Sequence, residues 1–537
     1  MKNNKILIFL IALYSLLMLS VISWGVPTEA RPFTYNMDEW HQLQSVRYLF
    51  AYGTPNIPGA AHGSIFQFFL SGVHLIPFVI FKFVDPFAIN SLIDNLVMQG
   101  KLFVVMRLNT LMFGILTLIT LAIIIKRYFK SNPILVAIFT IGTPIWLTLS
   151  SYFKYDIALI FWITLSILFL LRYAKYPTQK NFIFSAIPCA LSLATKVSAV
   201  PILAIYVFGF FLFTPNWYKK YKYLVLGISA FLGIFIVFGI PDLFLRLGDY
   251  AEYLSSNLIT SVKADDNYLL GTPNKWIYIL FTLFPMIFGH IFYPLFLVVL
   301  AYWLIKIIKW FYLKKYTAHR NEIFLFFSFA VFFLSLIPLG LGGSGNRALV
   351  LLPFFSLLSA KFIADILKLK KYRVYVFILI IILALVQFYE SSVVVYSRYN
   401  KNVLQESSAW IAKNLPEGIT IGIENIPIYQ TLPYVVLKEY YVSALDKYAK
   451  TKYKYEIIDA STKELPQIVI ITNRYVSEKY LIKSPKKDLL MRLKKENYQN
   501  IKEFMPNSKL YKLYNDDLGY YLSGLNFVLP VTIYERG

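Results

Sequence analysis

Long apolar runs, separated by short clusters of lysine and arginine, constrain this chain more than any other feature. The runs are about 17–25 residues long, and an α-helix of that length crosses a bilayer. The mean hydropathy is +0.57, and 58% of the residues are hydrophobic while only 15% are charged. Ordinary soluble domains carry about 25% charged residues. The pattern therefore predicts a polytopic α-helical membrane protein.

The formal net charge of +24 does not indicate a nucleic-acid partner, because the basic residues gather between the apolar runs. This distribution is typical of cytoplasmic loops. The tail 443–515, rich in Lys and Tyr, adds charge that suits anionic lipid heads. We therefore expect membrane lipids, and no nucleic acid, as partners of the clusters Lys2/Lys5, Lys126–Lys130, Arg172–Lys180, Lys219–Lys222, Lys306–Arg320 and Lys368–Arg373.

The same clusters predict the topology. With Lys2 and Lys5 inside, the run Ile6–Trp24 carries the chain outward, and it has no small-residue cleavage site that would mark a signal peptide. The run 103–125 must then return inward to reach Lys126–Lys130. The apolar stretch Ser64–Phe83 is therefore expected to be juxtamembrane or re-entrant, within a long first outer loop at 25–102.

Further spans are predicted toward the carboxyl end, which gives about eleven transmembrane helices, a cytoplasmic N-terminus and an extracytoplasmic C-terminus. They lie at about 133–150, 157–172, 181–196, 199–214, 222–240, 287–308, 321–340, 348–365 and 373–392.

Past Ser392 the chain becomes more polar and carries short alternating runs (Thr420–Ile423, Gln467–Thr472, Asn526–Tyr534) between helix-like stretches at 404–414 and 485–496. We expect a transmembrane domain at 1–392 and a small extracytoplasmic α/β domain at 393–537. The single cysteine, Cys189, excludes an intrachain disulfide and gives no support for a cysteine-rich metal site.

Asp38 and Glu39 are the strongest candidates for chemistry. Two adjacent carboxylates where the chain leaves the membrane are costly to keep near lipid, and there they can accept a proton or hold a cation. The alternative interpretation is that they lie in the first turn of a surface helix, where negative charge is favoured.

Several short motifs follow this pair in a fixed order along the chain. The motifs are His62-Gly63-Ser64-Ile65, Tyr152-Phe153-Lys154-Tyr155-Asp156, Leu193-Ala194-Thr195-Lys196, Asn346-Arg347-Ala348-Leu349 running to Pro353, Trp410-Ile411, and Leu415-Pro416-Glu417-Gly418. Their order and expected sidedness are similar to those of the GT-C superfamily of membrane glycosyltransferases, and most to the branch of protein O-mannosyltransferases and lipid A aminoarabinose transferases. The first motif lacks the two prolines that this family has there.

This resemblance implies an inverting glycosyltransferase that takes a sugar from a polyprenyl-phosphate donor and gives it to a protein or glycolipid acceptor on the outer face of the membrane. Asp38 would be the general base, and Glu39 and Asp156 would position groups or bind a divalent cation. The donor phosphate would be bound by four basic side chains: Lys154, Lys196, Arg347 and, on its motif alone, His62. No cofactor is certain, and metal dependence stays open.

Each residue also has a structural interpretation. Lys154 and Lys196 suit snorkelling to the interface, Arg347 suits a loop without a ligand, and Asp156 suits an N-cap. His290 suits helix packing, and Asp265-Asp266 suits a solvated loop.

The alternative function is a multi-span transporter or flippase of lipid-linked or anionic solutes. Such proteins usually contain internal repeats and ionisable groups near mid-span, and the sequence shows neither pattern clearly. A non-catalytic accessory role in envelope assembly is a third alternative.

Overall fold

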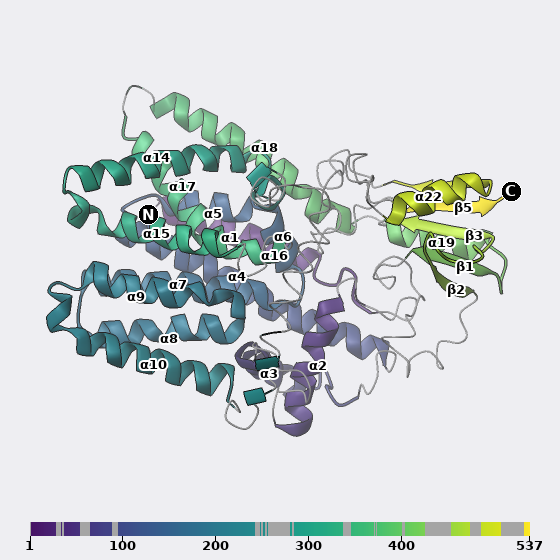
Figure 1. Cartoon of the computed structure of the whole chain (residues 1–537), viewed down its shortest axis with the longest axis horizontal. Helices are drawn as coiled ribbons and strands as arrows, with labels where there is room; N and C mark the ends of the chain where they lie inside the picture. Colours follow the sequence, from purple (N-terminus) through teal and green to yellow (C-terminus); the bar gives the residue numbers. More distant parts are fainter. Residues whose placement is uncertain are drawn as a thin grey trace.

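The structure is a computed structural model that describes residues 2–27, 34, 37–53, 65–88, 95–241, 247–248, 251–252, 255, 280–281, 284–336, 345–369, 371, 373–399, 403–424, 453–472, 485–505 and 531–537. Most of the described chain is a bundle of helices whose larger members lie side by side (Figure 1). The helices are α1 (Lys2–Ser20), α2 (Met37–Tyr52), α3 (Ile65–Ile80), α4 (Leu96–Tyr128), α5 (Pro133–Ile141), α6 (Pro144–Ser150), α7 (Tyr155–Lys175), α8 (Gln179–Thr195), α9 (Pro201–Phe213), α10 (Tyr221–Gly239), α13 (Phe284–Phe288), α14 (Phe292–Tyr312), α15 (Arg320–Ser335), α16 (Gly345–Ala348), α17 (Leu352–Ile366) and α18 (Arg373–Tyr399).

Each apolar run that the sequence predicts to span the membrane overlaps one of these helices. Within the described residues, six helices are long and apolar enough to cross a bilayer, or seven if α5 and α6 form one broken span. The chain is therefore a membrane protein, as expected, while the number of about eleven spans remains a prediction. The stretch predicted to be juxtamembrane forms α3, a shorter apolar helix.

The break between α5 and α6 follows from the local sequence. Pro144 has no backbone N–H and disfavours helical geometry at the residue before it. Thr143 accordingly is extended, with φ −83° and ψ 117°, and the two helices are bent by 75°. This bend directs the segment Ser151–Lys154 toward the end of the bundle where α7 begins.

The helices α7 and α8 form an antiparallel hairpin. Asp156 in the first turn of α7, and Arg172 and Lys175 in its last turn, complement the helix dipole. Thr178 caps α8 by accepting a hydrogen bond from the Asn181 N–H (3.3 Å). The hairpin therefore brings the start of α7 and the end of α8 to one end of the bundle, and Arg172 and Lys175 to the other.

The two ends of the bundle differ in what they carry. The N-terminus and the connections α7–α8, α9–α10 and α14–α15 gather at one end, on the left of Figure 1. The C-terminal sheet lies beyond the opposite end, on the right. We call the first the basic end, because its connections and the helix ends next to them hold Lys175, Lys180, Lys219, Lys220 and Lys314.

The C-terminal unit is a five-stranded sheet between two helices, α19 (Val403–Asn414) and α22 (Pro485–Lys495). Its strand order is β2-β1-β3-β5-β4; β1 pairs in parallel with β2 and β3, and β5 pairs antiparallel with β3 and β4. The strands are β1 (Thr420–Glu424), β2 (Lys454–Ile458), β3 (Ile468–Thr472), β4 (Tyr498–Phe504) and β5 (Val531–Arg536). The sequence patterns predicted the regions of β1, β3, β5 and both helices, but not β2 or β4.

Alternation along β3 explains why both faces are covered. Ile468 and Ile470 pack into the apolar cluster that includes Ile411 of α19, whereas Val469 and Ile471 pack into the cluster that includes Leu489 of α22. Side chains of a strand alternate between the two faces of the sheet, so an unbroken apolar run needs cover on both sides.

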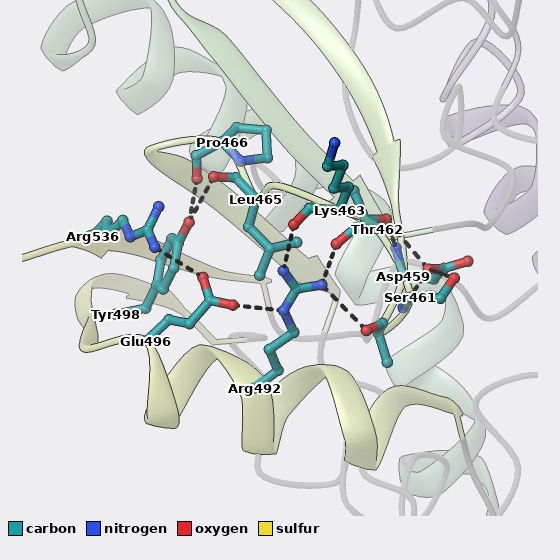
Figure 2. Close-up of polar contacts among 11 residues, drawn as sticks. Asp459, Ser461, Thr462, Lys463, Leu465, Pro466, Arg492, Glu496, Tyr498 and Arg536 are labelled. Carbon is teal, nitrogen blue, oxygen red and sulfur yellow. Dashed lines mark hydrogen bonds and ion pairs between the residues drawn. The ribbon is translucent and has the colours of Figure 1, made fainter.

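Arg492 of α22 fastens the connection between β2 and β3 (Figure 2). Its guanidinium donates to the carbonyl oxygens of Ala460 and Lys463 (3.2 Å each) and of Thr462, and its Nε contacts Glu496 Oε1 at 2.6 Å. The helix thereby supplies hydrogen bonds to the carbonyl oxygens of this turn.

Candidate functional site

Glu39 lies in the first turn of α2 and is completely buried, with 0% of its surface exposed. Its Oε1 accepts hydrogen bonds from Arg107 Nε (2.8 Å) and the Phe153 N–H (2.7 Å). Its Oε2 accepts from Arg107 Nη2 (2.7 Å) and Thr34 Oγ1 (2.5 Å). A carboxylate has about four lone-pair positions, so this side chain has its accepting capacity filled. The alternative interpretation placed this acid in the first turn of a surface helix. Glu39 does lie in a first turn, but in the interior of the protein.

Arg107 lies within α4 and contacts several other segments at this end of the bundle. Besides the two contacts with Glu39, its Nη1 donates to the carbonyl oxygens of Ile22 (2.7 Å) and Trp24 (2.6 Å), just after α1. One buried guanidinium therefore connects the exit of α1 and the start of α2 to α4. Through Glu39 it also reaches the segment before α7.

Asp156 and Lys196 form an ion pair next to this cluster. The Lys196 Nζ lies 2.7 Å from Asp156 Oδ1, and the two side chains are 17% and 2% exposed. Lys196 Nζ also lies 4.9 Å from the centre of the Tyr155 ring. The Asp156 Oδ2 atom is buried and has no hydrogen-bond partner among the residues that the structure describes. Asp156 occupies the first turn of α7 while Lys154 holds the N-cap position, so the N-cap alternative for Asp156 does not hold.

Lys154 lies in the chain between the segment that contacts the Glu39–Arg107 pair and the residue that forms the Asp156–Lys196 pair. It follows Phe153, whose N–H donates to Glu39, and precedes Tyr155 and Asp156. Its side chain is 4% exposed, which does not fit a lysine that snorkels to the water interface. Glu39, Lys154, Asp156 and Lys196, which the sequence proposed separately, therefore meet at the end of the bundle opposite the basic end.

A second arginine, Arg398, lies buried in the same cluster near the end of α18. It donates a hydrogen bond to Ser151 Oγ, and its guanidinium lies 5.0 Å from the Trp24 ring and 5.2 Å from the Tyr152 ring. Burial, reinforced by the charge of Arg107, lowers the pKa of Arg398 to about 10, while Tyr152 and Glu39 oppose this shift. The guanidinium thus remains protonated at neutral pH.

Tyr152 lies between the two arginines. Its ring centre is 5.6 Å from the guanidinium carbon of Arg107 and 5.2 Å from that of Arg398, and it is 2% exposed. Burial raises the pKa of Tyr152 above its ordinary value. Among the side chains that the structure describes in this cluster, the cations are the buried Arg107, Lys154 and Arg398 and the half-buried Lys196, and the carboxylates are Glu39 and Asp156.

The remaining predicted site residues are placed less fully. The backbone of Asp38 lies in the first turn of α2, but its side chain is outside the described residues. His62 and the pair Asp265-Asp266 also lie outside them. Arg347 lies in the short helix α16 rather than a loop, and α16 packs against α6.

Sequence reasoning missed Arg107 and Arg398. Arg107 was readable in principle, because it stands inside the apolar run 103–125, and an arginine within a predicted span needs an anionic partner. Arg398 follows the last predicted span and resembles any interfacial arginine, so only its burial distinguishes it.

His290 lies in a different polar cluster, with the last bundle helix. Its Nδ1 lies 2.7 Å from Glu390 Oε1, and its backbone N–H also points to that carboxylate. Gln387 Oε1 accepts from the Phe292 N–H (3.1 Å) at the start of α14. This cluster joins α14 to α18.

No group of three or more His, Cys, Asp or Glu side chains that would hold a metal ion occurs within the described ranges. Asp38 and His62 fall outside this statement.

Comparison with known proteins gives a family match over the region that holds most of the site. Residues 36–248 match the model of the family described as dolichyl-phosphate-mannose-protein mannosyltransferase. This range includes Asp38, Glu39, Lys154, Asp156 and Lys196. No curated protein sequence matches the chain.

Three solved structures illustrate the similarity of shape. ArnT from Cupriavidus metallidurans bound to undecaprenyl phosphate is 10% identical, with 99% of this chain and 98% of that chain covered and a TM-score of 0.45. The Archaeoglobus fulgidus oligosaccharyltransferase with Zn and sulfate is 12% identical (93% and 72% covered, TM-score 0.48). The S. cerevisiae protein O-mannosyltransferase complex bound to its sugar donor is 15% identical (46% and 34% covered, TM-score 0.35). Similarity at this level does not define equivalent residues.

The family match confirms the resemblance inferred from the motifs. Over residues 36–248 the chain resembles the protein O-mannosyltransferases.

Proposed function

We propose that the chain is a GT-C-type glycosyltransferase that transfers a sugar, with inversion, from a polyprenyl-phosphate donor to a hydroxyl or amine of a protein or glycolipid acceptor. The observation that carries the proposal is the Glu39–Arg107 ion pair, which holds the first turn of α2, and with it Asp38, against the segment that leads to Lys154 and Asp156. The backbone of Asp38 and a group of cations thus share one end of the bundle. That pairing suits a reaction in which an acceptor loses a proton while a phosphate departs.

Asp38 acts as the general base in this proposal. The acceptor oxygen or nitrogen attacks the anomeric carbon, its proton passes to the Asp38 carboxylate, and the bond between the anomeric carbon and the phosphate oxygen breaks. The electron pair of that bond leaves with the polyprenyl phosphate. Glu39 is adjacent but is saturated with donors, so its role is to position α2 rather than to accept the proton or bind a divalent cation.

Lys154 and Lys196 stabilise the leaving phosphate. Positive charge placed in advance where negative charge develops lowers the barrier, and it does so more strongly in a site that excludes water. Asp156 orients the Lys196 ammonium through the 2.7 Å contact. Arg347 and His62 are assigned to the same phosphate on the motifs that contain them.

The membrane arrangement of the proposal follows from the basic end. Loops rich in Lys and Arg stay on the cytoplasmic side, and we therefore propose that the site, the sheet and the C-terminus lie on the extracytoplasmic side of a multi-pass protein with about eleven spans. We propose residues 1–392 as the catalytic domain, with the outer loop 25–102, and 393–537 as the outer domain. Helix α18 runs across that boundary to Tyr399.

The test is a transfer reaction with the purified full-length chain. Polyprenyl-phosphate sugars, with mannose and aminoarabinose as the first two, are incubated with candidate peptide and glycolipid acceptors, and both glycosylated product and free polyprenyl phosphate are quantified. We expect the two to appear in equal amounts, with the product of inverted anomeric configuration. Movement of the intact donor across liposomes without release of polyprenyl phosphate would instead support the transporter alternative.

A further inference from the structure

A groove of about 590 Å³ opens between α7 and α8, away from the site described above. One part of its lining is polar and belongs to the basic end: Arg172, Thr178, Lys180 and Asn181. The other part is apolar and runs along the hairpin, with Trp162, Phe169 and Phe184 among its residues. The groove therefore has a cationic head and a hydrophobic body.

The cationic part lacks carboxylates of its own. From Tyr155 to Gly239 the chain contains one acidic residue, Asp156, and it lies at the opposite end of α7. The separation between Asp156 and Arg172 is sixteen residues of helix, or about 24 Å. Within the described part of the chain, neither Arg172 nor Lys180 forms an ion pair with an acid, and Lys180 Nζ lies 5.7 Å from the Phe184 ring.

Exposed aromatic residues indicate the depth of this groove in the membrane. Tyr176, Trp217, Tyr218 and Tyr221 are all exposed at the basic end. Tyr and Trp collect at the level of the lipid head groups. Phe184, which lines the groove more than a turn further along α8, is 44% exposed, as expected for a side chain at the depth of the acyl chains.

We propose that this groove binds an anionic phospholipid of the leaflet at the basic end. The lipid phosphate lies between Arg172 and Lys180, with Thr178 and Asn181 as neutral hydrogen-bonding neighbours, and one acyl chain follows Phe169 and Phe184 toward Trp162. Charge complementarity selects the anionic lipid over a zwitterionic one, because no acidic side chain on this hairpin is available to bind a choline or an ethanolamine group. The site is separate from the donor site, and the proposal does not depend on the proposed transfer reaction.

The experiment is native mass spectrometry of the delipidated full-length protein, titrated with phosphatidylglycerol and with phosphatidylcholine of identical acyl chains. We expect phosphatidylglycerol to bind more tightly. Replacing both Arg172→Gln and Lys180→Gln should weaken it by roughly thirtyfold, since each basic residue near an anionic head group contributes about fivefold. The matched control is Lys219→Gln with Lys220→Gln, which removes the same charge at the same end but outside the groove lining.

A second variant keeps the charges and fills the apolar part. Ile187→Trp, at a partly exposed position of the lining, should also weaken phosphatidylglycerol. Equal affinity for the two lipids, or equal losses in the groove and control pairs, would overturn the proposal. Competition by inorganic phosphate at the concentrations that saturate the lipid would also overturn it, because the groove would then be a site for a free anion.

Discussion

Glu39 and Arg107, 68 residues apart in the chain, form a bidentate ion pair. Arg107 Nε lies 2.8 Å from Glu39 Oε1 and Arg107 Nη2 lies 2.7 Å from Glu39 Oε2, and the side chains of Glu39 and Arg107 are 0% and 1% exposed. Ion pairs with this geometry are stronger and more directional than single contacts. Because both groups are buried, removing either one would leave an unpaired charge in the interior. The position of α2 therefore depends on the pair.

Removing one member of this pair should destabilise the protein strongly. Arg107→Met leaves the Glu39 carboxylate buried without its cation, and such changes cost about 3–5 kcal/mol. The double variant Glu39→Gln with Arg107→Met should recover part of this loss, because no unpaired charge remains. Thermal unfolding in detergent measures both. Lys175→Met is the control, since an exposed basic residue changes stability by about 0.5 kcal/mol or less; a similar small effect of Arg107→Met would show that the pair is dispensable.

Asp38→Asn should abolish sugar transfer while expression and unfolding temperature stay close to those of the wild type. The change removes the proton acceptor and keeps the shape of the side chain, and loss of a positioned general base lowers the rate about 10²–10⁴-fold. The transfer assay on the purified protein measures it. Asp85→Asn, an exposed acid in the same predicted outer loop, should behave as the wild type. Wild-type turnover by Asp38→Asn would remove Asp38 from the mechanism.

Lys196→Gln should raise the KM for the lipid-linked donor about ten- to a hundredfold, since a hydrogen bond to a charged group contributes about 1.5–3 kcal/mol. Arg347→Gln is expected to act in the same direction, and Lys82→Gln is the exposed control. Lys196 also neutralises Asp156, so the double variant Asp156→Asn with Lys196→Gln separates two roles. A donor KM that returns to the wild-type value in the double variant would mean that Lys196 only neutralises Asp156.

Cysteine labelling should place both ends of α3 on the outer side. In a Cys189→Ala background, Tyr52→Cys and Phe87→Cys, both at exposed positions, should react with an impermeant thiol reagent added to intact cells. Tyr176→Cys at the basic end should react only after the membrane is opened. Protection of position 87 together with labelling of position 52 would mean that the apolar stretch Ser64–Phe83 crosses the membrane.

Much of the helical architecture was predictable because it depends on local properties. The length of an apolar run matches the bilayer thickness, and a proline such as Pro144 breaks a helix wherever it stands. The family motifs likewise named Glu39, Lys154, Asp156 and Lys196, which the structure brings to one end of the bundle. Neither the pattern nor the motifs indicated β2 and β4, whose short runs (Lys454–Ile458 and Tyr498–Phe504) contain several polar residues.

The contacts within the site were not predictable, because they depend on how helices pack across long sequence separations. No feature of the sequence near Glu39 indicates that Arg107 and the Phe153 N–H donate hydrogen bonds to its carboxylate. The adjacent acids Asp38 and Glu39 look equivalent in sequence. Packing against α4 assigns Glu39 to an interior ion pair with Arg107.

The sequence by itself determined that the chain is a membrane protein with helices of defined extent and basic connections between them. The length of an apolar run and the distribution of charge are local properties, which do not depend on contacts with distant parts of the chain. Only the tertiary structure decided which cation meets which carboxylate, that Arg107 and Arg398 lie buried beside Tyr152, and that Arg172 and Lys180 flank a groove. The physical reason is that burial of charge is a property of the assembled bundle: desolvation penalises each isolated ion, and the packed helices supply its counter-ion from a distant part of the chain.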